Sequence, residues 1–259
     1  MRADPVHLQL RRDQLVLLPV PDISLAEATQ LCGEVNEHLT GQDLAFFAPH
    51  PQRWYVRIDA LPAIETVPLS LAVGHNVNDL LPKGADALRW HRLFNDIQML
   101  LHSHPVNQAR ESGGASTVNS VWFWGCGCDS DLAVTSHGKF GRVSSDEPFA
   151  EMLASAAGIP FVKCSGQWYG GGGEHNELLV CTGLRQALQK GDIGAWRAVL
   201  QDFEIGYAQP LWEALRNGKV NRLTIDILSG INSRNLQLDR ADSWAFWRLS
   251  GTLTGYSLV

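Results

Sequence analysis

The sequence of 259 residues lacks any apolar run near the roughly 20 residues that a membrane-spanning helix requires. It also lacks the basic start and apolar stretch of a secretory signal peptide. Its composition, 45% hydrophobic and 19% charged, excludes a disordered or coiled-coil chain. We therefore expect a soluble, cytoplasmic protein that does not bind membranes. The length allows one large domain or two small ones.

An excess of positive charge is missing too. The chain has 21 Lys and Arg against 27 Asp and Glu, a net charge of −6. A general nucleic-acid binder needs a basic face for the phosphate backbone, so no nucleic-acid partner is expected. The cysteines are five in number and lack the spacing of a disulfide framework. This usage is typical of reduced thiols in a cytosol.

Familiar catalytic signatures are absent as well. The sequence contains no Gly-x-Ser-x-Gly elbow, no His-Glu-x-x-His and no Walker loop, and no nucleophile–base pair can be assembled locally. Cys126-Gly-Cys128, near Asp129, Asp131 and His137, lacks the spacing of a zinc site, so small buried thiols beside a strand are the better interpretation. We expect no catalytic residue, no metal and no cofactor.

Hydrophobic periodicity predicts the elements of the first half. The run 14–20 indicates a buried strand, and Ser24-Leu-Ala-Glu27 is a capping box that starts a helix. Residues 43–60 predict two strands joined by a turn, and 61–86 an irregular segment. Helical spacing returns from Ala87 to Leu101, and Pro105 is placed to end that helix.

The second half predicts a strand–helix–strand unit. Val121–Trp124 and 160–164 would be its strands, around a helix that starts near Ser144 and ends at Gly158. Residues 178–215 are predicted to be helical with uncertain breaks. A strand at 220–228 would carry Leu223, Ile225 and Ile227 on one face, and a final helix at 239–248 would dock Trp244 and Trp247. The predicted class is α/β, with a mixed sheet flanked by helices.

The stretch from His102 to Gly127 gathers most of the polar, glycine and aromatic signals. Arg110 could grip a phosphate or carboxylate bidentately, and Asn107 and Asn119 could donate to the same anion. Alternatively, Arg110 and Asn119 tie a loop to the edge of the sheet, and spacing alone favours this second interpretation. His102 and His104 point about 200° apart on a helix, so they could share a metal only on an extended segment.

This stretch resembles the archaeal-type cofactor-independent phosphoglycerate mutases, two-metal enzymes of the alkaline phosphatase superfamily. The matching residues are His104-Pro-Val-Asn107, Arg110, and Asn119 to Gly127. Upstream, Phe46–Pro49, Arg53–Arg57 and Leu80–Gly84 resemble that family's inserted domain, and Phe149 to Val162 resembles the return into its core. The likeness covers roughly 44–165. A bacterial group of mutase-related "RpfE-type" regulatory proteins resembles the chain nearly end to end.

The resemblance implies a shortened alkaline-phosphatase-like core with an α+β insert-like portion. It divides the chain into an N-terminal strand and helix of the core at 1–40, the insert-like portion at 41–105, and a shortened phosphatase-like α/β portion at 106–259. It also implies that His104, Asn107, Arg110 and Asn119 are the ligand-binding residues.

The chain lacks the metal-binding and nucleophile motifs of this family. The mutases have a strand ending in a metal-binding Asp-Gly, a Ser or Thr nucleophile, and later Asp-Glu-Ala-Gly-His and Asp-His motifs. Here the comparable strand ends Pro19-Val-Pro-Asp22, and the later motifs are missing. Phosphoryl transfer of this kind needs two close cations. We therefore expect a catalytically degenerate mutase-like protein that has a regulatory or ligand-binding role.

Two alternatives remain. One is an active metal-dependent phosphomutase or phosphatase on a small phosphorylated metabolite, with ligands from Asp22, His137, His175, Asp226 and Asp239. The other is a structural or partner-docking protein whose tryptophans form an interface. The candidate partners are a small phosphorylated or carboxylate ligand and another protein.

Overall fold

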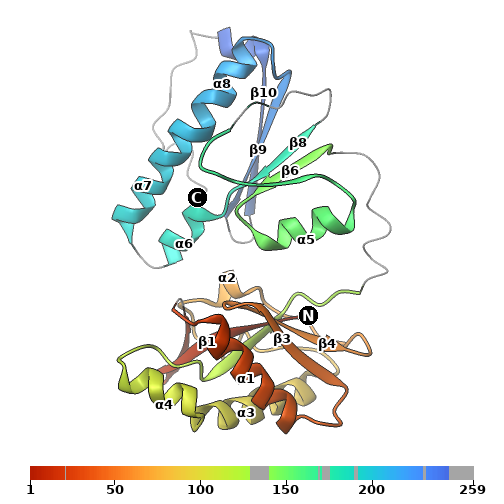
Figure 1. Ribbon diagram of the computed structural model, residues 1–259, viewed down its shortest axis with the longest axis vertical. Helices are drawn as coiled ribbons and strands as arrows, with labels where there is room; N and C mark the ends of the chain where they lie inside the picture. Colours follow the sequence, from red (N-terminus) through yellow and green to blue (C-terminus); the bar gives the residue numbers. More distant parts are fainter. Residues whose placement is uncertain are drawn as a thin grey trace. The chain divides into compact units, whose positions relative to one another are not determined.

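The computed structural model describes residues 1–20, 22–128, 140–168, 170, 176–189, 192–229 and 232–244. The chain forms two compact units, Met1–Asp131 (unit 1) and Leu132–Val259 (unit 2). Sheets flanked by helices occur in both, which confirms the α/β class (Figure 1). In the part that the structure describes, no helix is long and apolar enough to cross a membrane.

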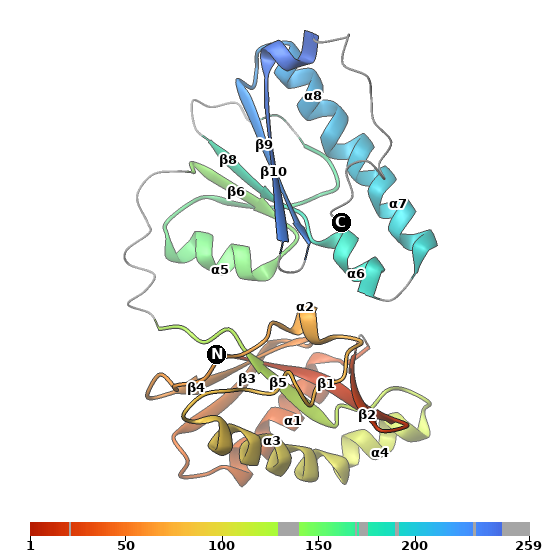
Figure 2. The same cartoon turned by 180° about the vertical axis from the view of Figure 1, so that it is seen from behind.

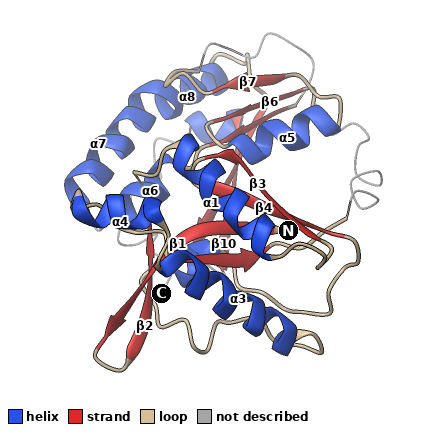
Figure 3. Cartoon of the chain, turned by 60° about the horizontal axis from the view of Figure 1, so that its bottom comes forward, coloured by secondary structure: helices blue, strands red, loops and turns tan. Residues whose placement is uncertain are grey.

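Unit 1 is built on an antiparallel five-stranded sheet among its described residues. Its strands are β1 (Arg2–Arg11), β2 (Gln14–Pro19), β3 (Leu44–His50), β4 (Arg53–Ile58) and β5 (Ser120–Trp124). The helices are α1 (Leu25–His38), α2 (Leu69–Ala72), α3 (Ala87–His102) and α4 (Pro105–Ser112). Figures 2 and 3 show α1 and α3 on one face of the sheet, where they bury its apolar side chains.

Strand β1 is the centre of unit 1. Its residues 2–6 pair with β5, with Arg2 opposite Trp124 and Val6 opposite Ser120. Arg2 also pairs with Tyr55 of β4, and residues 6–11 pair with β2. Because Arg2 and Val6 each have partners on both sides, β5 follows one edge of β1 while β4 and β2 follow the other. No sequence pattern predicted this strand.

An internal ion pair explains how so polar a strand can be central. Asp4 is fully buried, and both of its carboxylate oxygens accept from Arg2, at 2.7 and 2.9 Å. The Trp124 indole donates to it at 2.7 Å. Burial raises the pKa of Asp4, although the Arg2 charge opposes that shift. The Arg2 guanidinium lies 5.2 Å from the Tyr55 ring centre and 5.1 Å from that of Trp124.

The elements that periodicity predicted in unit 1 are confirmed. Ser24 and Glu27 form the capping box of α1, and α3 buries Trp90, Leu93 and Ile97 on one face. In β4, Trp54 and Val56 are buried and alternate with less buried neighbours. Pro105, expected only to end a helix, occupies the first turn of α4, because proline suits a position whose N–H has no helical acceptor.

Unit 2 contains a parallel three-stranded sheet in the order β7-β6-β8 and a separate hairpin, β9–β10. The strands are β6 (Arg142–Ser145), β7 (Phe161–Lys163), β8 (Glu177–Val180), β9 (Arg222–Ser229) and β10 (Asn232–Asp239). The helices are α5 (Pro148–Ala156), α6 (Gly183–Gln189), α7 (Ile193–Phe203) and α8 (Gln209–Arg216). A π-helix, Glu204–Ala208, joins α7 to α8, and a 3-10 helix spans Arg240–Trp244.

Unit 2 corrects several sequence predictions. The strand–helix–strand unit exists, but its first strand is β6 and not Val121–Trp124, which pairs antiparallel with β1 in unit 1. Strand β6 was missed because three of its four residues are polar. Ser144, the predicted helix start, lies within it, and Glu147 caps α5 instead.

Two further predictions were wrong in part. The region 178–215 begins with strand β8, because a short apolar run such as Leu178–Val180 fits a strand as well as a helix. The strand predicted at 220–228 is present as β9, but Ile225 and Ile227 are 41% and 48% exposed. Trp244 is 58% exposed, with the Arg216 guanidinium 5.8 Å from its ring centre, while Trp247 lies outside the described residues.

The resemblance predicted three portions of the chain, 1–40, 41–105 and 106–259, and this division stays a prediction. Strands β1, β3 and β5 come one from each portion, yet they belong to one sheet. The first two portions and the start of the third therefore fold around a common core.

We expect Ile97→Ala to destabilise unit 1 by about 2–5 kcal/mol, because the fully buried side chain leaves a cavity under the sheet. Met99→Ala is the matched control on the same helix. Met99 is 74% exposed, so its truncation should change stability by less than about 0.5 kcal/mol. Urea denaturation of the full chain measures both, and equal effects of the two substitutions would contradict the placement of α3.

Candidate functional site

Asn107 is buried within the first turn of α4, and its amide is fully engaged with the main chain. Its nitrogen donates to the carbonyls of Leu101 at 2.7 Å and Val118 at 2.8 Å. Its oxygen accepts from the Val118 N–H at 2.8 Å. One side chain thus joins the end of α3 to the segment that enters β5.

Arg110, also on α4, is buried and bound on several sides. Its guanidinium donates to the Ser116 carbonyl at 2.7 Å, to the Asp22 carbonyl at 3.3 Å and to the Glu27 carboxylate at 2.9 Å. Glu27 is the residue that completes the capping box of α1. Arg110 therefore connects the start of α1 to the loop before β5.

His104 and Asn119 also bond to the main chain. The His104 Nδ1 accepts from the Val106 N–H at 3.1 Å, which caps α4. The Asn119 oxygen accepts from the Leu8 N–H at 2.7 Å, and its nitrogen donates to the Leu8 carbonyl at 2.9 Å. Asn119 thereby continues the β1–β5 pairing beyond Val6–Ser120, where main-chain pairing ends.

The structure thus brings the four predicted ligand-binding residues into the same part of unit 1. Their hydrogen bonds are those of the alternative interpretation, in which they hold the loop to the sheet and to α1. Ligand binding by these residues stays a prediction. A shallow depression of about 460 Å³ lies beside them, lined by Gln98, Met99, His102 and Asn119. His102 is exposed at the end of α3.

A second candidate site lies in unit 2. Strands β7 and β8 flank β6 and run parallel to it, so their carboxyl ends meet at one edge. Ligands of open α/β sheets bind outside such an edge, where connections leave in opposite directions. Asp146, Cys164 and Cys181 follow β6, β7 and β8 there. A π-helix, a feature often found near functional sites, lies beside this edge.

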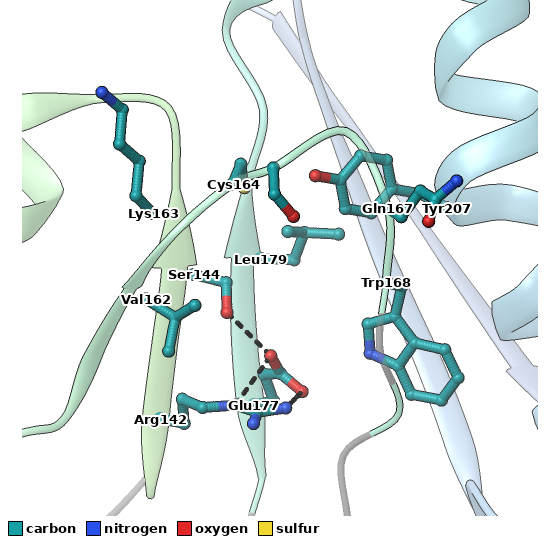
Figure 4. Close-up of a pocket in the computed structure, with 11 residues that line it drawn as sticks. Arg142, Ser144, Val162, Lys163, Cys164, Gln167, Trp168, Glu177, Leu179 and Tyr207 are labelled. Atoms are coloured by element: carbon teal, nitrogen blue, oxygen red, sulfur yellow. Dashed lines mark hydrogen bonds and ion pairs between the residues drawn. The ribbon is translucent and has the colours of Figure 1, made fainter.

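The pocket on this sheet is small, about 60 Å³, and the half-buried ion pair of Arg142 and Glu177 lines it (Figure 4). The Glu177 carboxylate accepts from Arg142 at 2.7 and 3.0 Å, and from the Ser144 hydroxyl at 2.8 Å. Burial opposes ionisation of Glu177, but these donors and the Trp168 indole hold its pKa below the usual value.

Two thiols and a phenol gather at the carboxyl edge. Burial raises the pKa of Cys164, and burial together with Cys164 and Asp146 raises that of Cys181 to about 12. Burial and the two thiols raise the pKa of Tyr207 to about 12, and its hydroxyl accepts from the Gly166 N–H at 3.2 Å. A Cβ at residue 206 would collide with the Gly166 carbonyl, so this π-helix must carry glycine.

The sequence analysis did not single out this second site. Cys164 and Cys181 stood in the sequence only as two of five scattered thiols, and Tyr207 fell in a region read as plain helix. The signal that could have found them was a short strand-like run ending in cysteine, Phe161-Val-Lys-Cys164 and again Leu178-Leu-Val-Cys181.

Metal-binding predictions can be assessed only in part. Within the residues that the structure describes, no group of three His, Cys, Asp or Glu side chains converges as a metal site. Several of the residues considered as metal ligands lie outside the described residues: Asp129, Asp131, His137 and His175.

Comparison with known proteins identifies a family of relatives. No family model matches the chain. A probable 2,3-bisphosphoglycerate-independent phosphoglycerate mutase of Geobacter sulfurreducens is 30% identical over 175 residues, covering 64% of this chain and 43% of that protein. A 2,3-bisphosphoglycerate-independent phosphoglycerate mutase of Methanosarcina mazei is 26% identical over 148 residues, covering 56% of this chain and 37% of that protein.

A solved cofactor-independent phosphoglycerate mutase from Thermoplasma acidophilum aligns with a TM-score of 0.39 and 12% identity, covering 76% of this chain and 58% of that one. The relationship therefore rests on the sequence matches. They make this chain a distant relative of the cofactor-independent phosphoglycerate mutases. It matches less than half the length of either curated relative.

Asn107→Ala should destabilise the protein by about 2–3 kcal/mol, because it removes the bonds that the side chain makes to the buried N–H and carbonyl of Val118 and one of the bonds to the Leu101 carbonyl. Gln108→Ala, at the next and exposed position of α4, is the control and should have little effect. Thermal and urea unfolding measure the difference. Unchanged stability in Asn107→Ala would show that the amide is not a structural joint.

Glu27→Gln should lower stability at pH 7 by about 1–2 kcal/mol, because it weakens the cap of α1 and the bond to Arg110. Burial opposes ionisation, but the bonds from Ser24 and Arg110 hold the pKa of Glu27 below its usual value of 4.5. The stabilisation is thus present above about pH 4.5 and is lost as the pH falls through the folded-state pKa.

Urea unfolding from pH 7 to pH 3 tests the Glu27 prediction, with exposed Glu34 on the same helix substituted in the control Glu34→Gln. The gap between Glu27→Gln and the native chain should narrow at low pH. A gap that widens on acidification would contradict the assigned bonds.

Proposed function

We propose that this chain is a catalytically degenerate relative of the cofactor-independent phosphoglycerate mutases that acts as a cytoplasmic regulatory or ligand-binding protein. The observation that carries the proposal is the internal use of the motif that the chain shares with the mutases. Asn107, Arg110 and Asn119 bond to main-chain groups of Leu8, Ser116 and Val118, and Arg110 also to Glu27. A scaffold role accounts for their presence without any demand for phosphoryl transfer.

The hairpin of unit 2 supports the proposal against the active-enzyme alternative. Two of the alternative's metal ligands, Asp226 and Asp239, are on this hairpin. Asp226 lies opposite Asn235, and Asp239 opposite Arg222, four residues further along. At about 3.3 Å per residue they are about 13 Å apart. With metal–oxygen bonds of about 2.0–2.2 Å, that separation is too large for both carboxylates to bind the same cation.

Both carboxylates are also engaged locally. Asn235 donates to Asp226 at 2.6 Å, and Arg222 donates to Asp239 at 2.8 Å. Metal binding at either position would have to replace these bonds. The arrangement favours a hairpin stabilised by cross-strand pairs over a metal centre.

The ligand is best sought at the depression beside the motif in unit 1. Its volume of about 460 Å³ falls within the range of small-molecule sites, whereas the pocket of unit 2 has only about 60 Å³. The Gln98 amide and the His102 imidazole offer polar groups to a phosphate or carboxylate. A small phosphorylated or carboxylate metabolite is therefore the proposed ligand class.

The mutase assay tests the proposal directly. Purified full chain, supplied in turn with Mn²⁺ and Mg²⁺, should convert no 3-phosphoglycerate to 2-phosphoglycerate beyond the buffer rate. An active cofactor-independent mutase assayed in parallel is the positive control. Turnover that is lost on chelation and restored by metal would overturn the proposal in favour of the enzyme.

Binding is measured separately by calorimetry with 3-phosphoglycerate as the probe. A ligand-binding role predicts saturable binding that weakens about 30-fold in Gln98→Ala/His102→Ala, since each of the two lost polar contacts is worth about 1 kcal/mol. Leu88→Ala, exposed at the other end of α3, is the control. Absence of binding would remove this ligand and leave the partner-docking alternative.

A further inference from the structure

Two cysteines occupy equivalent positions on either side of β6. Lys163 of β7 and Val180 of β8 are both paired with Ser145, and each is followed directly by a cysteine. The Cys164 N–H donates to the Ser145 carbonyl at 2.9 Å, which fixes its place at the edge. The two thiols therefore approach each other from both sides, in front of the end of the central strand.

We propose that Cys164 and Cys181 together bind one soft, monovalent cation of the Cu(I) class as a pair of thiolates. Thiolate sulfur selects such cations over hard ones. The site is independent of the proposed ligand-binding function, because it lies in unit 2 and uses none of the residues shared with the mutases.

The spacing of the strands favours a bridging ion over a disulfide. Two inter-strand steps of about 4.8 Å separate β7 from β8, or about 9.6 Å between equivalent main-chain positions. A disulfide needs Cα atoms no more than about 6.8 Å apart, so it would require the strand ends to converge. Two metal–sulfur bonds of about 2.3 Å add reach between side chains that lean inward.

The number of donors favours a two-coordinate ion. The Asp146 oxygens accept from the Thr182 N–H and hydroxyl, at 2.9 and 3.1 Å, and from the Gly183 N–H at 3.1 Å. That carboxylate caps α6 and contributes charge without a free ligand atom. Tyr207, with its raised pKa, stays protonated. Zn²⁺ requires four ligands, and no third one converges in the described part of the chain.

The chemistry at the site is an exchange of protons for a cation. Both thiols lose their protons to solvent, two sulfur–copper bonds form, and the ion keeps its single positive charge, so no oxidant or reductant is consumed. Burial raises the pKa of both thiols in the free protein; the Asp146 charge adds to the rise for both, and the Cys164 charge adds to it for Cys181. A cation between the sulfurs relieves the repulsion among these charges.

The test is an anaerobic titration of the reduced full chain with Cu(I), in competition with the chelator bicinchoninate. Cys126 and Cys128 are replaced by serine throughout, because a Cys-x-Cys pair could bind copper itself. The expected result is one Cu(I) per chain, with affinity reduced about 100-fold or more in Cys164→Ser and in Cys181→Ser. Ser165→Ala, beside the site, is the matched control and should bind normally. Zn²⁺ should bind at least about 100-fold more weakly than Cu(I).

Peptide mapping tests the same claim in the native chain, where no substitution can disturb folding. Trypsin cleavage after Lys163 and Arg185 releases a peptide that contains Cys164, Cys181 and no other cysteine. Copper should protect both thiols from alkylation, and its removal should restore two alkyl groups. Any of three results would overturn the proposal. They are Cu(I) binding that the serine variants leave unchanged, Zn²⁺ binding tighter than Cu(I) binding, and the finding that the two thiols of the initially reduced protein lose two hydrogen atoms and form a disulfide.

Discussion

The fold of unit 1 depends on two asparagine side chains that act as pieces of main chain. Asn119 bonds to both the N–H and the carbonyl of Leu8, so it continues the β1–β5 pairing for one more step. Asn107 satisfies the main chain at Leu101 and Val118 and thereby ties α3 to the entry of β5. Buried polar groups of the main chain must be paired, and here side chains pair those that the sheet and helices leave over. Without them the strand in the middle of the sheet would lose its register partner.

This constraint gives a physical reason for a family resemblance that need not imply shared chemistry. The residues on which the sequence resemblance to the phosphoglycerate mutases was argued include Asn107, Arg110 and Asn119, whose hydrogen bonds close unit 1. The matches cover less than half of either curated relative. What the chain shares with them is, on this account, a way of joining α3, α4 and β5.

Periodicity and capping predicted the elements whose sequences satisfy local rules, such as α1 with its capping box and α3 with its apolar face. Strand β1 was not predicted, because Asp4 and Pro5 are unfavourable in a central strand. The Arg2 ion pair and the hydrogen bond from the Trp124 indole are what stabilise the buried Asp4 there. Strand β6 was not predicted, because it is short and polar. The motif residues were named from the sequence, but their hydrogen-bond partners lie up to 111 residues away, and spacing cannot identify such partners.

The central claim is that the motif shared with the mutases holds unit 1 together. Amide hydrogen exchange at Leu8 and Val118, the two N–H groups bonded to the asparagine side chains, measures this most directly. The account predicts that both amides are already strongly protected in the free protein and exchange only through global unfolding. Fast exchange in the free protein, slowed only when a phosphorylated ligand is added, would show that the motif serves a ligand and would contradict the account.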